Sequence, residues 1–278
     1  MVARDLSIVF FSYKFFYLAA MTDPKLLAIE ASTEWCSVAL LGTQSPVFWV
    51  EQTGSRSSQR ILPMVREVLA QAGVNLQQCE AIAFGCGPGS FTGLRTVCAV
   101  VQGLAYPWDI PVLPVTTLQS LAEQARPLMS ADQQSGRIAT VLDARMGEVY
   151  WAVYEARVAG VCLVEAGLAS PSDCANALLA MMDQQPLSIC GNGVSLYPEL
   201  LIRLGDEVSV IAKQSNLSLL GGEGQADWPN ALGVATVAQQ FWAAGQRYSA
   251  AQAQPLYVRN KVALTTAERL AQKAAQVM

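Results

Sequence analysis

A glycine-rich loop at residues 85–95, GCGPGSFTGLR, is the segment of this chain best suited to hold a chemical group. It follows a short apolar run, Ala81–Phe84, and leads into an apolar stretch, Leu94–Ala105, that is too long for a second strand. A strand, a glycine loop and a helix in this order place free backbone N–H groups at a helix N-terminus, where phosphates bind. Such loops also serve as plain turns, and glycine content alone does not decide between the two roles.

Three well-known loop patterns do not fit this segment. A dinucleotide-binding fingerprint, G-x-G-x-x-G, meets a serine or threonine where its last glycine should stand. A Walker loop needs a lysine before its Ser/Thr, and the segment contains no lysine. Ser90 follows Gly89 directly and Gly93 lies three residues further on, so the hydrolase pattern G-x-S-x-G is absent as well.

Histidine is absent from all 278 residues. This excludes a Ser-His-Asp triad, imidazole general acid–base chemistry and mixed nitrogen–sulfur zinc sites. The seven cysteines are odd in number and lack any C-x-x-C spacing, so we expect reduced thiols and no metal. For Cys86, inside the glycine loop, we favour a small buried filler over a thiol activated by helix N–H groups.

The charge content limits the partners that the chain can bind alone. Charged residues make up 14% of the chain, against about a quarter in an average protein, and hydrophobic residues make up 52%. So few charges suggest that a partner buries part of the surface, although an ordinary alanine- and leucine-rich protein has the same composition. The net charge is −4 and no window holds a cluster of Lys and Arg, which argues against independent binding of nucleic acid.

Apolar runs at 26–31, 36–41 and 47–51 predict three strands, and alternating helices and strands follow them. This order predicts an α/β protein with a mixed sheet. After a polar break at 129–137 the pattern restarts, and Asp143 ends an apolar strand as Glu30 does in the first part. The repeat predicts two similar halves, and an amphipathic helix is expected near the C-terminus at about 229–247.

Four motifs resemble those of the TsaB (YeaZ) family, subunits of the bacterial machinery that makes threonylcarbamoyladenosine in tRNA. They are LLAIEAST at 26–33, QRILPMV at 59–65, GPGSFTGLR at 87–95 and DARMGEVYW at 143–151. The resemblance covers about residues 25–260. It implies an actin-like (ASKHA) α/β fold of two ribonuclease-H-like domains with mixed sheets.

The expected domain limits follow from the resemblance and the polar break. They are an N-terminal extension without a fixed fold at 1–24, a partner-binding first domain at 25–128, a smaller second domain at 137–260 and a C-terminal tail at 261–278. Translation is expected to begin at Met21, because the TsaB-like sequence opens there.

In related kinase-fold ATPases, acidic strand ends hold metal ions through water and glycine loops hold phosphates. The matching cleft residues of this chain are Glu30, Ser32, Thr33, Gly87, Gly89, Ser90 and Asp143. However, the second turn has one glycine, with bulky Arg145 and Met146 where a phosphate should lie, and family members commonly carry Asp in place of Glu30. We therefore expect a degenerate nucleotide cleft with no required cofactor and at most weak binding of ATP or ADP.

The catalytic sister of TsaB, called TsaD, carries two histidines four residues apart that bind a metal from one helix face. The similar segment here, residues 114–121, places Thr117 and Leu121 at those positions. Neither can replace an imidazole ligand. We therefore expect no catalytic residue and no metal site in this chain.

The resemblance implies that two helices of the first domain, at 57–72 and 94–105, form a helix bundle with TsaD. The expected interface residues are Ile61, Met64, Val65, Val68, Arg95, Val97, Cys98 and Val101. The same apolar stripes are also typical of helices that pack on a sheet. The family further implies a homodimer when TsaD is absent and TsaE as a third partner, and the loop Gly85–Gly93 and Arg95 are candidates for shaping that junction. From the charge and the reduced thiols we expect tRNA contact only through the complex, no membrane contact and a cytoplasmic location.

The sequence thus predicts a non-catalytic subunit of the tRNA N6-adenosine threonylcarbamoyltransferase complex. It would support TsaD at the adenosine next to the anticodon, position 37, of tRNAs that read ANN codons. One alternative is a small-molecule kinase or ATPase of the same fold that uses Glu30 and Asp143. The other is a peptidase, for which the chain offers no histidine base.

Overall fold

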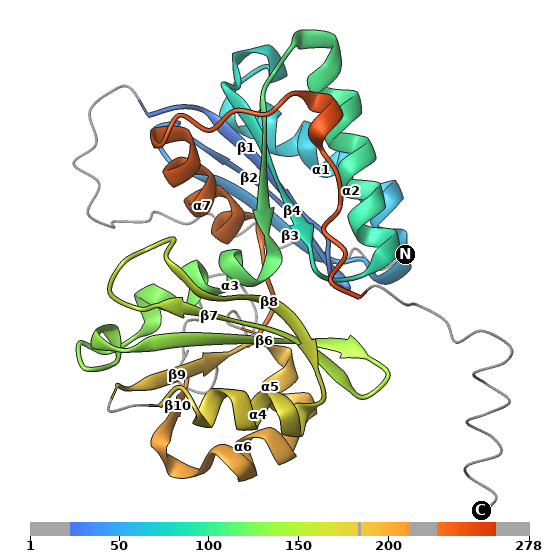
Figure 1. Ribbon diagram of the computed structural model, residues 1–278. Coiled ribbons are helices and arrows are strands. Elements are labelled where there is room, and N and C mark those ends of the chain that lie inside the picture. Colours follow the sequence, from blue (N-terminus) through green and yellow to red (C-terminus); the bar gives the residue numbers. More distant parts are fainter. Residues whose placement is uncertain (1–22, 183–184, 212–226, 260–278) are drawn as a thin grey trace, which may run out of the picture.

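The computed structural model describes residues 23–182, 185–211 and 227–259 (Figure 1). Two halves lie one above the other, and each contains one five-stranded mixed sheet with helices on both faces. The predicted N-terminal extension falls almost wholly outside the described residues, and the predicted tail at 261–278 lies entirely outside them. In the described part of the chain, no helix is long and apolar enough to cross a membrane.

The first sheet has the strand order β3-β2-β1-β4-β5. Strands β1 to β3 form an antiparallel meander, and β4 and β5 continue the sheet parallel to β1. β1 is buried along its whole length, which fits its unbroken apolar sequence because helices cover both faces of this sheet. The strands are β1 Leu26–Glu30, β2 Trp35–Leu41, β3 Val47–Gln52, β4 Ala81–Gly87 and β5 Val112–Thr116.

The second sheet repeats the first. Its order is β10-β9-β6-β7-β8, so that β8, β7, β6, β9 and β10 correspond to β3, β2, β1, β4 and β5 with the same strand directions. This duplication confirms the predicted pair of ribonuclease-H-like halves, and it places Asp143 on the counterpart of the Glu30 strand. The strands are β6 Arg137–Arg145, β7 Glu148–Glu155, β8 Cys162–Ala169, β9 Leu187–Cys190 and β10 Val208–Val210.

Each sheet separates two layers of helices. In the first half, α1 and α2 cover one face and α7 covers the other. In the second half, α4 and α6 cover one face, while α3 covers the face turned toward the first half. The helices are α1 Ser57–Ala72, α2 Phe91–Ala105, α3 Thr117–Ala125, α4 Pro171–Leu179, α5 Asn192–Leu196, α6 Pro198–Leu204 and α7 Ala231–Ala243.

The predicted domain limits are wrong at two helices. α7, placed by sequence in the range 137–260, packs on the first sheet, where Val234 and Ala238 contact the layer that contains Ala28 and Ala83. α3, placed in the range 25–128, contributes its apolar face to the core of the second sheet. An amphipathic pattern reveals that a helix has a buried face, but it does not reveal which sheet buries it.

The predicted interface stripe is also corrected. Seven of its eight residues form the core between the helices α1 and α2 and the first sheet, and each is 5% exposed or less. They are Ile61, Met64, Val65, Val68, Val97, Cys98 and Val101. Arg95 alone among the eight is exposed. The apolar stripes pack on the first sheet and are not available to a partner.

Candidate functional site

The glycine loop between β4 and α2 lies directly on the turn that follows β1. The Ser90 N–H donates to the Ser32 carbonyl oxygen at 2.6 Å. A Cβ atom at Gly89 would lie 2.5 Å from that oxygen, and one at Gly93 would lie 2.0 Å from the carbonyl oxygen of Ala31. These glycines therefore allow two backbone segments of the same chain to touch.

The same loop is covered from a second direction by the C-terminal part of the described chain. The Leu256 N–H donates to the Cys86 carbonyl oxygen at 2.7 Å, and a Cβ atom at Gly87 would lie 2.7 Å from the Leu256 carbonyl oxygen. Burial raises the pKa of the Cys86 thiol to about 12. A thiol of this kind is a buried filler rather than a nucleophile, in agreement with the role favoured from sequence.

Glu30, at the end of β1, is completely buried beneath the loop. Its Oε1 accepts a hydrogen bond from the Ser32 N–H at 2.5 Å, while Oε2 has no hydrogen-bond partner among the described residues. A Cβ atom at Gly85 would lie 1.7 Å from Oε2. Burial raises the pKa of this carboxyl, and the hydrogen bonds from Ser32 oppose the rise.

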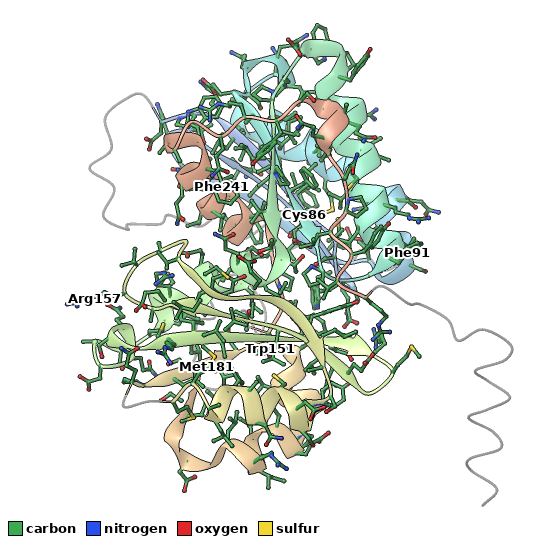
Figure 2. All side chains as sticks on the ribbon, viewed as in Figure 1. Cys86, Phe91, Trp151, Arg157, Met181 and Phe241 are labelled. Atoms are coloured by element: carbon green, nitrogen blue, oxygen red, sulfur yellow. The ribbon has the colours of Figure 1, made fainter. Side chains whose placement is uncertain are left out.

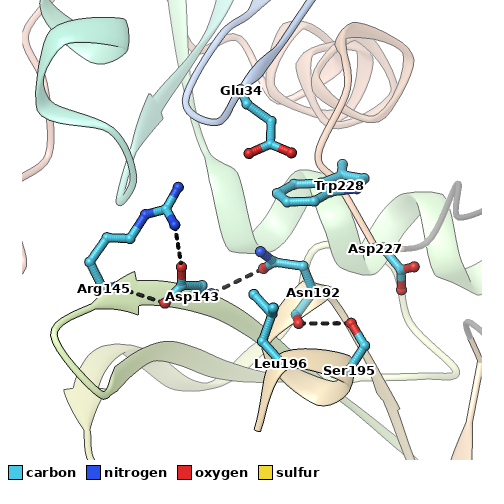
Figure 3. Close-up of a pocket in the computed structure, with 8 residues that line it drawn as sticks. All are labelled: Glu34, Asp143, Arg145, Asn192, Ser195, Leu196, Asp227 and Trp228. Carbon is cyan, nitrogen blue, oxygen red and sulfur yellow. Dashed lines mark hydrogen bonds and ion pairs between the residues drawn. The ribbon is translucent and has the colours of Figure 1, made fainter. Parts of the chain in front are cut away.

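A cavity of about 220 Å³ lies between the two halves (Figure 3). Of the seven predicted cleft residues, Asp143 is the one that lines it. Glu30 and Ser32 are buried in the first half, and the Thr33 hydroxyl accepts a hydrogen bond from the Trp35 N–H within its own turn. The lining residues are Glu34, Asp143, Arg145, Asn192, Ser195, Leu196, Asp227 and Trp228.

The Asp143 carboxylate is surrounded by donors from its own half. Its Oδ1 accepts from the Arg145 N–H and from the Tyr197 hydroxyl, each at 2.8 Å, and its Oδ2 lies 3.3 Å from the Arg145 guanidinium. The Asp143 N–H donates to the Asn192 side-chain oxygen at 3.0 Å. Burial, reinforced by the neighbouring carboxylate of Asp143, raises the pKa of Tyr197 to about 12. Both carboxylate oxygens are thus already engaged.

Arg145 occupies this position because of an unusual turn between β6 and β7. Arg145 and Met146 have φ values of 62° and 59°, in the left-handed region that non-glycine residues seldom adopt. Arg145 lines the cavity beside Asp143, as predicted from its bulk. Met146 does not line it and is 77% exposed, so the expectation that Met146 also fills the cleft is wrong.

A second glycine loop, which was not identified from the sequence, follows β9 in the second half. Residues 191–193, Gly-Asn-Gly, follow β9 just as residues 85–89 follow β4. A Cβ atom at Gly191 would lie 2.1 Å from the Val141 carbonyl oxygen, and one at Gly193 would lie 2.7 Å from the Val141 side chain. The signal in the sequence was an apolar run followed by two glycines, and it was missed because β9 was not predicted.

The cavity carries more negative than positive charge. The carboxyl groups of Glu34, Asp143 and Asp227 share it with the single guanidinium of Arg145. Burial raises the pKa of Asp227. Asp227 and Trp228 reach this place only through the long-range return of the chain to the first half, so no local sequence signal marked them. Such a lining repels phosphate groups.

No group of three or more His, Cys, Asp or Glu side chains among the described residues is arranged to hold a metal ion. Thr117 and Leu121, which the resemblance aligned with two metal-binding histidines, are fully buried in α3. Leu121 belongs to the core between α3 and the second sheet.

Comparison with known proteins gives consistent matches. Residues 51–276 match the family described as "TsaD: tRNA N6-adenosine threonylcarbamoyltransferase". The TsaB tRNA threonylcarbamoyladenosine biosynthesis protein of Escherichia coli (strain K12) is 34% identical over 240 residues, covering 86% of this chain and 96% of that protein. The Haemophilus influenzae TsaB protein is 32% identical over 251 residues, covering 87% and 96%. The solved structure of YeaZ from Pseudomonas aeruginosa is 36% identical with a TM-score of 0.69, covering 84% of this chain and 99% of that one.

The duplicated mixed sheets define a two-lobed α/β protein with two ribonuclease-H-like halves. Within that class, the chain belongs to the TsaB family of tRNA threonylcarbamoyladenosine biosynthesis proteins.

Proposed function

We propose that this chain is a non-catalytic subunit in the formation of threonylcarbamoyladenosine at position 37 of tRNAs that read ANN codons. It would pair with TsaD, which carries out the transfer, and the pair would receive TsaE as a third component. This proposal is supported by the names of the curated relatives, which cover most of the chain. We further propose that the chain works in the cytoplasm and contacts tRNA only within the complex.

The observation that supports the non-catalytic role is that groups expected to hold a nucleotide are already bonded within the chain. The Ser90 N–H of the glycine loop is bonded to Ser32, and the Asp143 carboxylate is bonded to Arg145 and Tyr197. With no histidine anywhere in the sequence, no imidazole remains to act as a base or ligand. We therefore propose that no cofactor is required and that ATP or ADP binds weakly at most.

For the TsaD-binding surface we propose the outward faces of α1 and α2, in place of the buried stripe predicted from sequence. Leu62 on α1 is 41% exposed, and Ala99 and Gly103 on α2 face away from the sheet. A Cβ atom at Gly103 would meet nothing within 4 Å, so a partner helix can approach closely there. Without TsaD, the same surface would pair with a second copy of the chain.

The test uses two substitutions that introduce a charge and a third, matched substitution as the control. Leu62→Glu and Gly103→Glu place a carboxylate on the proposed surface, and Ile202→Glu places one on α6, where Ile202 is 81% exposed. Calorimetric titration with TsaD should show weaker binding for the first two variants and unchanged binding for the third. Cells in which Leu62→Glu or Gly103→Glu is the only copy of this protein should lose threonylcarbamoyladenosine from their tRNA, as measured by mass spectrometry.

Two results would contradict the proposal. Normal TsaD binding and normal tRNA modification with both charges in place would exclude this surface. Tight, magnesium-dependent ATP binding with turnover by the isolated chain would instead favour the kinase or ATPase alternative. The two outcomes are independent, because the first concerns the α1 and α2 surface and the second concerns the cleft.

A further inference from the structure

Residues 248–259, here called the strap, run beside α2 from the first half toward the second (Figure 1). Tyr248 forms a β-bridge with Val112, and the Gln102 side chain donates to the Ala253 carbonyl oxygen at 3.0 Å. Further along, the Leu256 N–H is bonded to the glycine loop. The strap is therefore attached to the first half at several points along its length.

The strap also contributes to the hydrophobic cores of both halves. Ala253 is buried among the residues that pack α1 and α2 on the first sheet. Five residues later, Val258 packs against the core of the second half, which includes Leu118 and Ile138. The strap thus joins the two cores on the α2 side of the molecule, opposite the face that α7 covers.

Tyr257 anchors the strap to the start of α2. Its ring stacks on Phe91 with the ring centroids 5.3 Å apart, and its hydroxyl accepts a hydrogen bond from Arg95 at 2.9 Å. The Arg95 guanidinium lies 3.7 Å from the centroid of the Phe91 ring (Figure 2 labels Phe91). This cluster holds the strap immediately before it crosses to the second half.

Arg259 attaches the strap to the β6–β7 turn of the second half. Its guanidinium contacts the Glu148 carboxylate at 2.6 Å and the Ala144 carbonyl oxygen at 3.1 Å, and its side chain is only 13% exposed. A second nitrogen lies 3.1 Å from the Met146 sulfur. These partners belong to the turn whose left-handed residues place Arg145 against Asp143 in the cavity.

We propose that the strap is a latch that fixes the angle between the two halves and holds the β6–β7 turn in the shape that keeps Arg145 on Asp143. Arg259 is the positioning residue of this latch. The halves also meet through α3 and α7, which pack on each other on the far side of the first sheet. An attachment on the opposite side of the molecule restricts rotation of the halves about that contact region.

The test compares Arg259→Gln with Arg157→Gln, which removes an exposed arginine from the β7–β8 turn. Hydrogen exchange should accelerate by about tenfold or more at the Leu256 amide and at residues 144–148 in Arg259→Gln, with no change in the control. Spin labels on unnatural keto residues at Ser58 and Glu199, both exposed, should report a broader distance distribution only in Arg259→Gln. Keto residues leave the seven cysteines unlabelled.

The charge-swapped pair Arg259→Glu with Glu148→Arg should restore slow exchange if the contact is a latch. Exchange within about twofold of the unaltered protein at Leu256 and the turn, with an unchanged distance distribution, would overturn the proposal. If Arg259→Gln does not fold, Tyr257→Leu must still accelerate exchange at Leu256 while the α7 amides remain protected, and the latch is rejected if it does not. These readouts use the isolated chain, so they do not depend on TsaD or on the proposed function.

Discussion

Inside the first half, the Glu30 carboxyl occupies the space that a side chain at Gly85 would need. A Cβ atom at Gly85 would lie 1.7 Å from Glu30 Oε2, so Gly85→Ala should destabilise the protein by about 1–3 kcal/mol or more through overpacking. Adding Glu30→Ala removes the clashing carboxyl, so the double variant should lose less stability than the sum of the two single ones. Chemical denaturation of all three variants measures this coupling, and strict additivity would contradict the shared space.

Glu30 also predicts a pH dependence. Its pKa is raised in the folded state, so the folded protein holds this proton more tightly than the unfolded chain does. Stability therefore falls as the pH rises from the ordinary carboxyl pKa toward the raised value, because ionisation then opposes burial. Glu30→Gln cannot ionise, and its advantage in melting temperature should be small near pH 4 and larger at pH 7–8. An advantage that shrinks with rising pH would contradict a raised pKa.

At the scale of the elements, α2 presents two faces with different roles. Its inner face is core, while Gly103 on its outer face has open space around its Cβ position. Gly103→Ala should therefore stabilise the isolated chain by about 0.5–1 kcal/mol, because glycine is a poor helix residue. The same methyl group should weaken TsaD binding if a partner helix packs there. Thermal melts and calorimetry separate the two effects, and unchanged affinity would move the interface away from Gly103.

Charges placed on the inner faces should have a different outcome. Ile61 and Val97 are fully buried, so Ile61→Asp or Val97→Asp should cost more than about 4 kcal/mol and abolish cooperative unfolding. Loss of TsaD binding by these variants would then report unfolding rather than a damaged interface. Circular dichroism checks this before any binding assay, and a normal melt with either aspartate would mean that this stripe is not core.

The same two helices show how far the sequence could predict the structure. The apolar repeat of α1 gave its limits at 57–72 correctly, since the repeat depends only on local spacing. It could not reveal whether Ile61 and Val65 face a sheet or a partner, because both environments select the same residues. The prediction of a nucleotide cleft lacked the same kind of long-range information. The glycines of the loop at 85–93 were correctly identified, but the atoms that fill the space above them, at Ser32 and Leu256, come from distant segments.

For the whole molecule, the decisive feature is that the first half is completed by α7, the last α-helix of the described chain. The chain leaves the first sheet after β5, builds the second half, and returns with α7 to cover Leu26, Ala83 and Val115. A late segment that closes an early sheet makes the two halves depend on each other, although each has its own core. It also explains why a division at 129–137, sensible from composition, does not separate two independent domains.

This dependence predicts the behaviour of a chain that ends at Ile211. This truncation removes both α7 and the strap. Loss of α7 alone exposes the apolar face of the first sheet and forfeits the burial of Val234, Val237 and three alanines, about 5 kcal/mol or more. That loss is comparable with the entire stability of an ordinary domain, so the first half should not fold cooperatively. Melting followed by circular dichroism and binding of a hydrophobic dye should reveal a disordered first half, whereas a chain ending at Arg259 should melt normally. A truncated chain with native-like exchange protection in β1 and β4 would show that α7 covers the sheet without supporting it.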